Sequence, residues 1–158
     1  MPSPELVECA RMGTEPVFGL GGQGPSAISH SSKFMRGLPF ARDYEKRPWG
    51  EFFTISEETG FSKVKVIRIN PGQRTSLQLH HKREEIWQIV DGAAEAEIDG
   101  EVYKLRQGFQ LEVALAVPHR LRCEGACPAV IIEQQLGACE ETDIVRLHDD
   151  YGRAIWQA

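Results

Sequence analysis

Long apolar segments and C-x-x-C cysteine pairs are absent from this 158-residue sequence. No run of about 18 apolar residues occurs, and the start, MPSPELVECARMG, lacks the basic and apolar regions of a signal peptide, so neither membrane insertion nor export is expected. The four cysteines form no C-x-x-C pair, and a chain of this size does not need disulfides for its stability. We therefore expect a reduced, cytoplasmic setting.

An excess of positive charge is also missing. Lysine and arginine total 18 against 23 acidic residues, and the net charge of -5 gives a pI near 5.6. Such a balance creates no general attraction for nucleic acid or for an anionic membrane, so neither partner is expected. An anionic small molecule would need a local basic pocket. With 41% hydrophobic and 26% charged residues, the composition is typical of one globular domain.

The first part of the chain, residues 1–46, has little hydrophobic periodicity. It contains several prolines, a glycine-rich patch over residues 19–24 and a cluster of serine and histidine over residues 29–32. The glycine patch lacks the G-x4-G-K-[ST] pattern of a phosphate-binding loop. The sequence therefore predicts an irregular N-terminal arm, followed by one domain over residues 47–158.

Short segments of high β propensity separated by glycine turns follow residue 47. Nine strands are predicted, over residues 50–56, 62–70, 75–80, 86–90, 94–98, 101–105, 109–113, 119–123 and 130–135. Asp99-Gly100 is the strongest hairpin signal among the turns. The tail from residue 140 is expected to add a helical turn or an edge strand. This pattern indicates an all-β sandwich or barrel.

Three polar residues, Gln78, His80 and Glu85, have the spacing Q-x-H-x4-E, and His119 follows downstream. In a strand, Gln78 and His80 point to the same face. If residues 81–84 form a turn, Glu85 returns beside His80 on the next strand. An amide, two imidazoles and a carboxylate would suit a divalent metal. The spacing alone favours ordinary surface and core residues over a metal site.

The glycines around this spacing carry a family resemblance. Gly72 and Gly92 complete G-x5-[H/Q]-x-H-x4-E-x6-G, the first signature of the cupins. In the second signature, which spans residues 108–123, His119 matches, whereas the usual Pro, Gly and Asn are replaced by the residues Ala114, Ala116 and Cys123. The chain resembles a cupin, which implies a double-stranded β-helix, or jelly-roll barrel. The replacements predict a new shape for the loop before His119.

Residues 47–153 more closely resemble the type II phosphomannose isomerase domain, usually the C-terminal part of bifunctional mannose-1-phosphate guanylyltransferases. The likeness rests on RPWG at 47–50, on S-L-Q-x-H-H-x-R-x-E-x-W at 76–87, on H-R-L at 119–121 and on D-I-V-R at 143–146. It implies interconversion of mannose 6-phosphate and fructose 6-phosphate. It also implies a metal site formed by Gln78, His80, Glu85 and His119.

Mixed nitrogen and oxygen ligands favour zinc first, while manganese, iron, cobalt and nickel would fit the same set. A sugar phosphate also requires cations and a proton carrier. The resemblance suggests catalytic roles for Lys65, Arg83 and Arg146, with Lys65 as a candidate proton shuttle. It suggests substrate contacts for Arg47, Trp87 and Arg153.

Two alternatives to the isomerase stay open at this point. One is a metal-binding cupin of another enzyme class, such as a sugar epimerase or an oxygenase, and the other is a non-catalytic sugar-binding cupin. The expected partner is a small-molecule sugar phosphate. The exposed strand edges of a jelly roll also make a homodimer the expected assembly.

Overall fold

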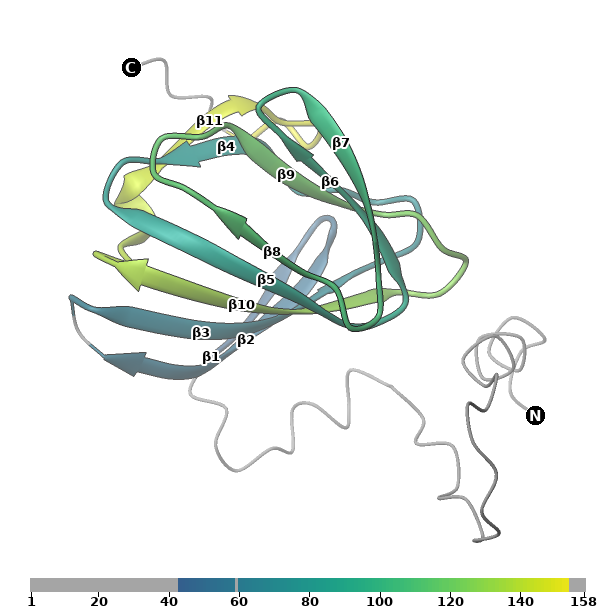
Figure 1. Cartoon of the computed structure of the whole chain (residues 1–158), viewed down its shortest axis with the longest axis horizontal. Coiled ribbons are helices and arrows are strands. Elements are labelled where there is room, and N and C mark those ends of the chain that lie inside the picture. The colour runs from purple at the N-terminus through teal and green to yellow at the C-terminus, as the bar shows by residue number, and fades with distance from the viewer. Residues whose placement is uncertain (1–42, 59, 154–158) are drawn as a thin grey trace, which may run out of the picture. The chain divides into compact units, whose positions relative to one another are not determined.

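The structure is a computed structural model that describes residues 43–58 and 60–153, so most of the predicted arm lies outside the described residues. Within them, antiparallel strands form two sheets (Figure 1). The six-stranded sheet has the order β1-β2-β3-β10-β5-β8 and the five-stranded sheet has the order β11-β4-β9-β6-β7. The elements are β1 (Asp43–Arg47), β2 (Gly50–Glu58), β3 (Ser62–Ile69), β4 (Leu77–His80), β5 (Arg83–Asp91), β6 (Ala93–Ile98), β7 (Glu101–Arg106), β8 (Gln110–Val113), β9 (His119–Cys123), β10 (Ala129–Gly137), the 3-10 helix η1 (Glu141–Asp143) and β11 (Ile144–His148).

Each of the nine predicted strands is present, with ends displaced by a few residues. The hairpin at Asp99-Gly100 is confirmed: both residues have positive φ, 50° and 84°, and Ile98 pairs with Glu101. The tail supplies both the predicted helical turn, η1, and an edge strand, β11. Regular alternation and glycine turns were therefore sufficient to locate the strands.

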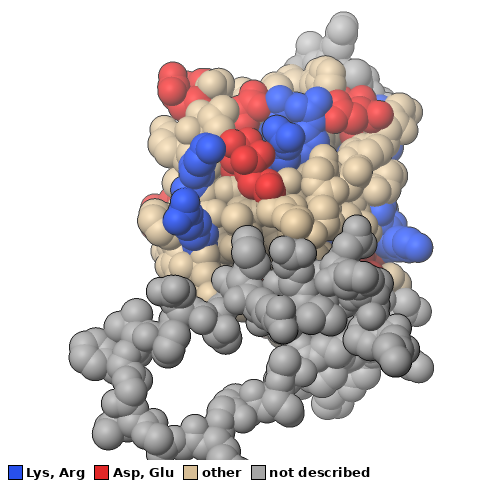
Figure 2. All heavy atoms as spheres, turned by 90° about the vertical axis from the view of Figure 1, so that its right-hand side faces the viewer, with Lys and Arg blue, Asp and Glu red and all other residues tan. Residues whose placement is uncertain are grey.

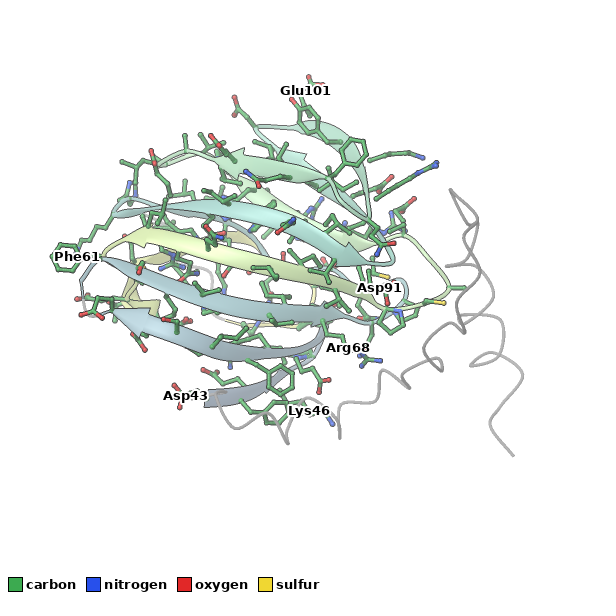
Figure 3. All side chains as sticks on the ribbon, turned by 60° about the horizontal axis from the view of Figure 1, so that its bottom comes forward. Asp43, Lys46, Phe61, Arg68, Asp91 and Glu101 are labelled. Carbon is green, nitrogen blue, oxygen red and sulfur yellow. The ribbon has the colours of Figure 1, made fainter. Side chains whose placement is uncertain are left out.

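Strand β1 crosses the predicted boundary between arm and domain at residues 46 and 47. The Tyr44 ring packs on Phe53 at a centroid distance of 5.0 Å, and the Tyr44 hydroxyl donates to Glu51 at 2.9 Å. These contacts attach residues 43–47 to β2 as the edge of the six-stranded sheet. Figure 3 shows Asp43 and Lys46 on this edge strand, and Phe61, 73% exposed, projecting from the turn between β2 and β3.

One detail of the predicted topology is wrong. The turn after His80 was expected to span residues 81–84 and to return Glu85 on a neighbouring strand. In the structure β5 begins at Arg83, and β4 and β5 belong to different sheets. The chain therefore crosses from one sheet to the other at residues 81 and 82, and His80 and Glu85 meet across the interior. Asp143 stabilises this corner because its carboxylate accepts the backbone N–H groups of His81 and Lys82, at 3.2 and 3.0 Å.

The interior changes character along two adjacent strands, β5 and β10. At one end their inward side chains are apolar and buried, as with Ile89 and Ile131, and belong to the hydrophobic core between the sheets. At the other end the inward positions are polar: Arg83, Glu85, Glu133 and Gln135. Buried polar groups are expensive unless they are paired, so this end of the barrel is where a site is expected.

Charged side chains on the outside are mixed in sign. On the face drawn in Figure 2, basic and acidic residues occur in small adjacent groups, and no extended basic surface is visible there. Arg122, for example, lies within 4 Å of both Glu95 and Glu124. Among the described residues, no helix has the length and hydrophobicity required to cross a membrane.

Candidate metal centre

Three predicted metal ligands meet inside the barrel. His80 comes from β4, Glu85 from β5 and His119 from β9, and their ligand atoms all lie within 4.8 Å of one another. The His80 Nε2 atom is 3.1 Å from Glu85 Oε1, and the His119 Nε2 atom is 3.5 Å from Glu85 Oε2. Each of the three side chains is about 2% exposed. The prediction that residues 80, 85 and 119 come together is confirmed.

His119 is held with one ring nitrogen directed at this cluster. Its Nδ1 donates to the Val117 carbonyl oxygen at 2.8 Å, which leaves a lone pair on Nε2. Burial lowers the pKa of His119 and therefore favours the neutral ring. Its Nε2 is buried and has no hydrogen-bond partner among the described residues, while it faces a carboxylate oxygen. Two electron-rich atoms in this position fit a cation between them.

His80 is oriented by a backbone contact. Its Nδ1 lies 3.5 Å from the Asp143 carbonyl oxygen, so Nε2 is the nitrogen that faces Glu85 and Arg83. The Arg83 Nη2 atom is 3.2 Å from His80 Nε2. With Nδ1 protonated, Nε2 carries the single lone pair that a metal ligand requires, and a bound metal would take the place of the Arg83 contact.

The fourth predicted ligand, Gln78, borders the same pocket. It pairs with His119 across β4 and β9, and its Nε2 lies 3.5 Å from His80 Nε2. Its Oε1 accepts from the Ser76 hydroxyl at 2.9 Å. Rotating the Gln78 amide by half a turn would exchange the positions of its oxygen and nitrogen. The contact with Ser76 would survive this exchange, because the Ser76 hydroxyl can accept as well as donate. The role of Gln78 as a ligand stays a prediction.

Neutral and charged donors hold the carboxylate of Glu85. Its Oε1 accepts from Arg83 Nε at 3.3 Å and from Gln135 Nε2 at 3.2 Å, and its Oε2 accepts from Trp87 Nε1 at 3.2 Å. Burial by itself would raise the pKa of Glu85. The contacts with His80, His119 and Arg83 outweigh burial and lower that pKa. Glu85 is therefore ionised, as a metal ligand must be.

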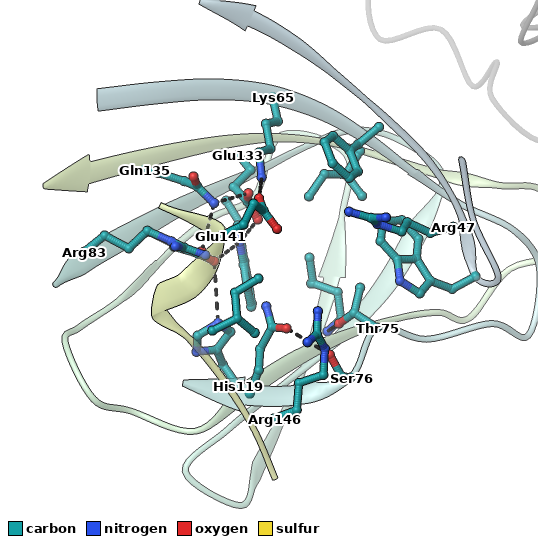
Figure 4. A pocket seen from close by; sticks show the side chains of 18 of the residues that line it. Arg47, Lys65, Thr75, Ser76, Arg83, His119, Glu133, Gln135, Glu141 and Arg146 are labelled. Carbon is teal, nitrogen blue, oxygen red and sulfur yellow. Dashed lines mark hydrogen bonds and ion pairs between the residues drawn. The ribbon is translucent and has the colours of Figure 1, made fainter. Parts of the chain in front are cut away.

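Cations surround the opening above the cluster. All predicted site residues except His80 line one pocket. Figure 4 shows Lys65, Glu133 and Gln135 on one wall and His119 and Arg146 on the other. The cations of this lining are Arg47, Lys65, Arg83, Arg146 and Arg153. Such a set suits an anionic ligand.

These cations differ in how far they are already paired. Lys65 donates to Glu141 at 3.1 Å, and Arg153 pairs with Asp149. Arg47 lies over the Phe52 ring at 5.3 Å and pairs with Glu45. Arg146 is different because its Nε is buried without a hydrogen-bond partner among the described residues. Burial, reinforced by the charge of Arg153, lowers the pKa of Arg146. An incoming anion would satisfy this guanidinium.

Trp87, predicted to contact substrate, is 2% exposed and lies at the pocket wall. Its indole N–H donates to Glu85 and Glu133, both at 3.2 Å, and its ring packs edge-on against His119 at 5.4 Å. These contacts position the side chains of Glu85 and His119. A direct contact between Trp87 and a sugar stays a prediction.

Glu133 lies in the pocket although it was not among the predicted site residues. Burial, followed by the charge of Glu85, raises the pKa of Glu133 to about 8. The available sequence signal was an acid at an inward position of β10, between Ile131 and Gln135. Following the inward and outward alternation of this strand would have placed Glu133 on the inward face. An acid at such a position indicates a functional role, since ionised carboxylates are rarely buried without a functional reason.

The loop before His119 keeps a conformation typical of glycine. Ala116 stands where the cupin signature has glycine, yet its φ is 59°. Its N–H donates to the His80 carbonyl oxygen at 2.7 Å, so the loop is tied to β4. The loop therefore retains a glycine-like turn at this residue, which is strained for alanine.

Replacing Ala116 by glycine should consequently stabilise the protein. We expect the free energy of unfolding of Ala116→Gly to rise by roughly 0.5 to 1 kcal/mol, because the relieved strain exceeds the extra freedom of glycine in the unfolded chain. Chemical denaturation measures this change. Ala114→Gly is the control: Ala114 does not have a positive φ, so that variant should lose stability. Equal losses in both variants would contradict the assignment of strain to Ala116.

Comparison with known families and curated proteins gives a consistent result. A family model described as mannose-6-phosphate isomerase C-terminal matches residues 41–149. The xanthan biosynthesis protein XanB of Xanthomonas campestris pv. campestris is 43% identical over 108 residues. The mannose-1-phosphate guanylyltransferase of Escherichia coli K12 is 38% identical over 108 residues. Each match covers 68% of this chain but only 23% and 22% of the relatives, so the chain spans less than a quarter of their length.

Among solved structures, the cupin domain of Schizosaccharomyces pombe Cnp3 matches with a TM-score of 0.53. The match covers 65% of this chain and 71% of that domain, at 10% sequence identity. A likeness at this level of identity concerns the fold alone. The predicted cupin jelly roll is confirmed.

Proposed function

Because the chain belongs to the family of mannose-6-phosphate isomerase C-terminal domains, we propose that it is a metal-dependent isomerase of mannose 6-phosphate and fructose 6-phosphate. One observation carries the proposal. The ligand atoms of His80, His119 and Glu85 lie within 4.8 Å of one another, in a pocket that is also lined by Arg146, whose Nε has no hydrogen-bond partner among the described residues. These three side chains would hold a divalent cation, and a Lewis acid beside a cationic rim is what the isomerisation of a sugar phosphate requires.

The residues present fit a divalent cation, with zinc as the first choice and manganese, iron, cobalt or nickel as alternatives. His80, Glu85 and His119 would hold it, with Gln78 as the fourth ligand. Such an ion supplies Lewis-acid stabilisation of the negative charge that develops on the carbonyl oxygen of the sugar.

The protein's own side chains would bind and orient the sugar phosphate. We assign the phosphate to Arg146, with Arg47 and Arg153 beside it, because planar guanidinium groups match phosphate oxygens in pairs. Arg83, which is 2% exposed and contacts both Glu85 and His80, would keep the cluster oriented. The buried walls from Trp87 and Phe52 would exclude water from the reacting carbons.

The decisive test is turnover by the full 158-residue chain. The protein is stripped with a chelator, reloaded separately with each candidate metal and incubated with mannose 6-phosphate, while proton NMR follows the formation of fructose 6-phosphate. We expect conversion with at least one metal and loss of more than about 100-fold in rate after chelation. Glucose 6-phosphate, which differs only at C2, is the matched control substrate. Absence of conversion with every metal would reject the isomerase and favour a sugar-binding cupin.

A further inference from the structure

Glu133 occupies the wall of the pocket in line with two predicted site residues. In the strand register Glu133 lies opposite Lys65 on β3 and opposite Trp87 on β5. The three side chains therefore form one row across the six-stranded sheet and face inward. Glu133 is 7% exposed and lines the pocket (Figure 4). Glu133 is therefore next to the candidate metal centre without belonging to it.

Glu133 and the metal ligand Glu85 share both of their neutral donors. The indole N–H of Trp87 is 3.2 Å from an oxygen of each acid. The amide nitrogen of Gln135 is 3.2 Å from Glu85 and 2.8 Å from Glu133. Neither donor brings a positive charge. Two carboxyl groups joined in this way favour one ionised and one protonated member.

The surroundings decide which acid is ionised. Glu85 lies against His80, His119 and Arg83, all of which favour its carboxylate. Glu133 lies beside Lys65, but the Lys65 ammonium donates to Glu141 instead. Burial accordingly raises the pKa of Glu133 to about 8, near the range in which a group can both take and return a proton.

We propose that Glu133 is the catalytic residue that carries the proton between C1 and C2 of the sugar phosphate. The proposal rests on the isomerase function proposed above. It moves the proton-carrying role from Lys65, the residue that the sequence suggested, to a carboxyl group on the adjacent strand. Lys65 becomes a positioning residue. Its positive charge lowers the free-energy cost of ionising Glu133.

The proton transfer balances without any further reactant. In the fraction of the protein in which Glu133 is ionised, its carboxylate takes the proton from C2 of open-chain mannose 6-phosphate, the C2–H electron pair forms the C1–C2 double bond, and the carbonyl electrons move to O1. The hydroxyl proton of O2 then passes to O1. The protonated Glu133 returns its proton to C1 as the C2–O2 double bond forms, giving fructose 6-phosphate. Atoms and electrons are conserved, and Glu133 regains its initial state.

Glu133→Gln tests the proposal because it removes the exchangeable proton and keeps the size of the side chain. We expect unchanged metal content, unchanged affinity for mannitol 1-phosphate, which has no carbonyl group, and a fall in turnover of about 100- to 10,000-fold. Incorporation of deuterium from heavy water at C1 of fructose 6-phosphate should fall in parallel. Turnover by Glu133→Gln above a tenth of the wild-type rate would overturn the proposal.

Two further variants keep the result interpretable. Lys65→Met should reduce turnover by less than about 10-fold, and abolition of deuterium exchange by this variant alone would return the role to Lys65. If Glu133→Gln does not fold, Glu133→Asp retracts the carboxyl group and should lose at least about 10-fold in turnover with metal content retained. Full activity of Glu133→Asp would overturn the proposal. Loss of metal or of mannitol 1-phosphate binding in proportion to turnover would assign Glu133 a structural role, which also overturns it.

The wild-type protein separates this proposal from the function on which it depends. If wild-type protein does not convert mannose 6-phosphate, the isomerase assignment and the role of Glu133 fall together. If wild-type protein converts the sugar and Glu133→Gln converts it equally well, only the role of Glu133 is rejected.

Discussion

His119→Ala is expected to remove bound metal and to lower the isomerisation rate by more than about 1,000-fold. The His119 Nε2 atom is buried, lacks a partner among the described residues and faces Glu85 at 3.5 Å. Alanine would leave Glu85 and His80 without this third ligand, in a site where the ring is 2% exposed. Metal content after dialysis, measured by atomic emission, and turnover of mannose 6-phosphate together check the expectation.

His81→Ala is the matched control for this prediction. His81 is adjacent in sequence to a ligand and is exposed, and its contact with Asp143 uses the backbone N–H, which alanine retains. Metal content and turnover should therefore equal those of the wild type. A His119→Ala protein that retains a full equivalent of metal would show that His119 is not a ligand, and the metal centre proposed here would then be wrong.

The second large effect concerns folding. Gly137 has a φ of 116°, and a Cβ atom there would lie 2.3 Å from the backbone oxygen of Lys82. Gly137 also pairs with Arg83, so β10 and β5 approach closely beside the site. Gly137→Ala must therefore either separate the strands or move the chain away from this backbone conformation. We expect it to lower the free energy of unfolding by about 3 kcal/mol or more, measured by chemical denaturation.

Gly100→Ala separates the steric clash from the conformational cost. Gly100 also has a positive φ, 84°, but an added Cβ would meet nothing within 4 Å. Gly100→Ala should lower the free energy of unfolding by about 1 to 2 kcal/mol, which is the cost of placing alanine in a left-handed conformation. Equal stabilities of the two alanine variants would show that the close approach at Gly137 is not important for folding.

The sequence predicted most of the fold because strand periodicity and turn chemistry act locally. Gly72 and Gly92 framed the metal-binding segment, and Asp99-Gly100 located a hairpin that the structure confirms. The pairing of Glu85 was predicted wrongly because a polar dipeptide at residues 81 and 82 is compatible with a hairpin turn and with a crossing between sheets. The carboxylate of Asp143, which stabilises the crossing, is distant in sequence.

The sequence predicted which three side chains come together but not the whole pocket. Histidine and glutamate at a recognisable spacing identified His80, Glu85 and His119, which meet in the structure; their role as metal ligands stays a prediction. Glu133 was not selected, because its importance depends on sharing Trp87 and Gln135 with Glu85, a relation that exists only after β10 pairs with β5. The strain at Ala116 was likewise invisible, since a replaced glycine does not reveal whether the backbone keeps its former angle.

Strands β5 and β10 are hydrogen-bonded neighbours. Their inward side chains are aliphatic at one end of the pair and ionisable at the other. The side chains of the candidate site are thus carried on a framework whose folding energy comes largely from apolar positions of the same strands. A descendant of this protein could acquire a different chemistry by exchanging a few inward residues at one end. The barrel would meanwhile retain the packing on which its folding depends.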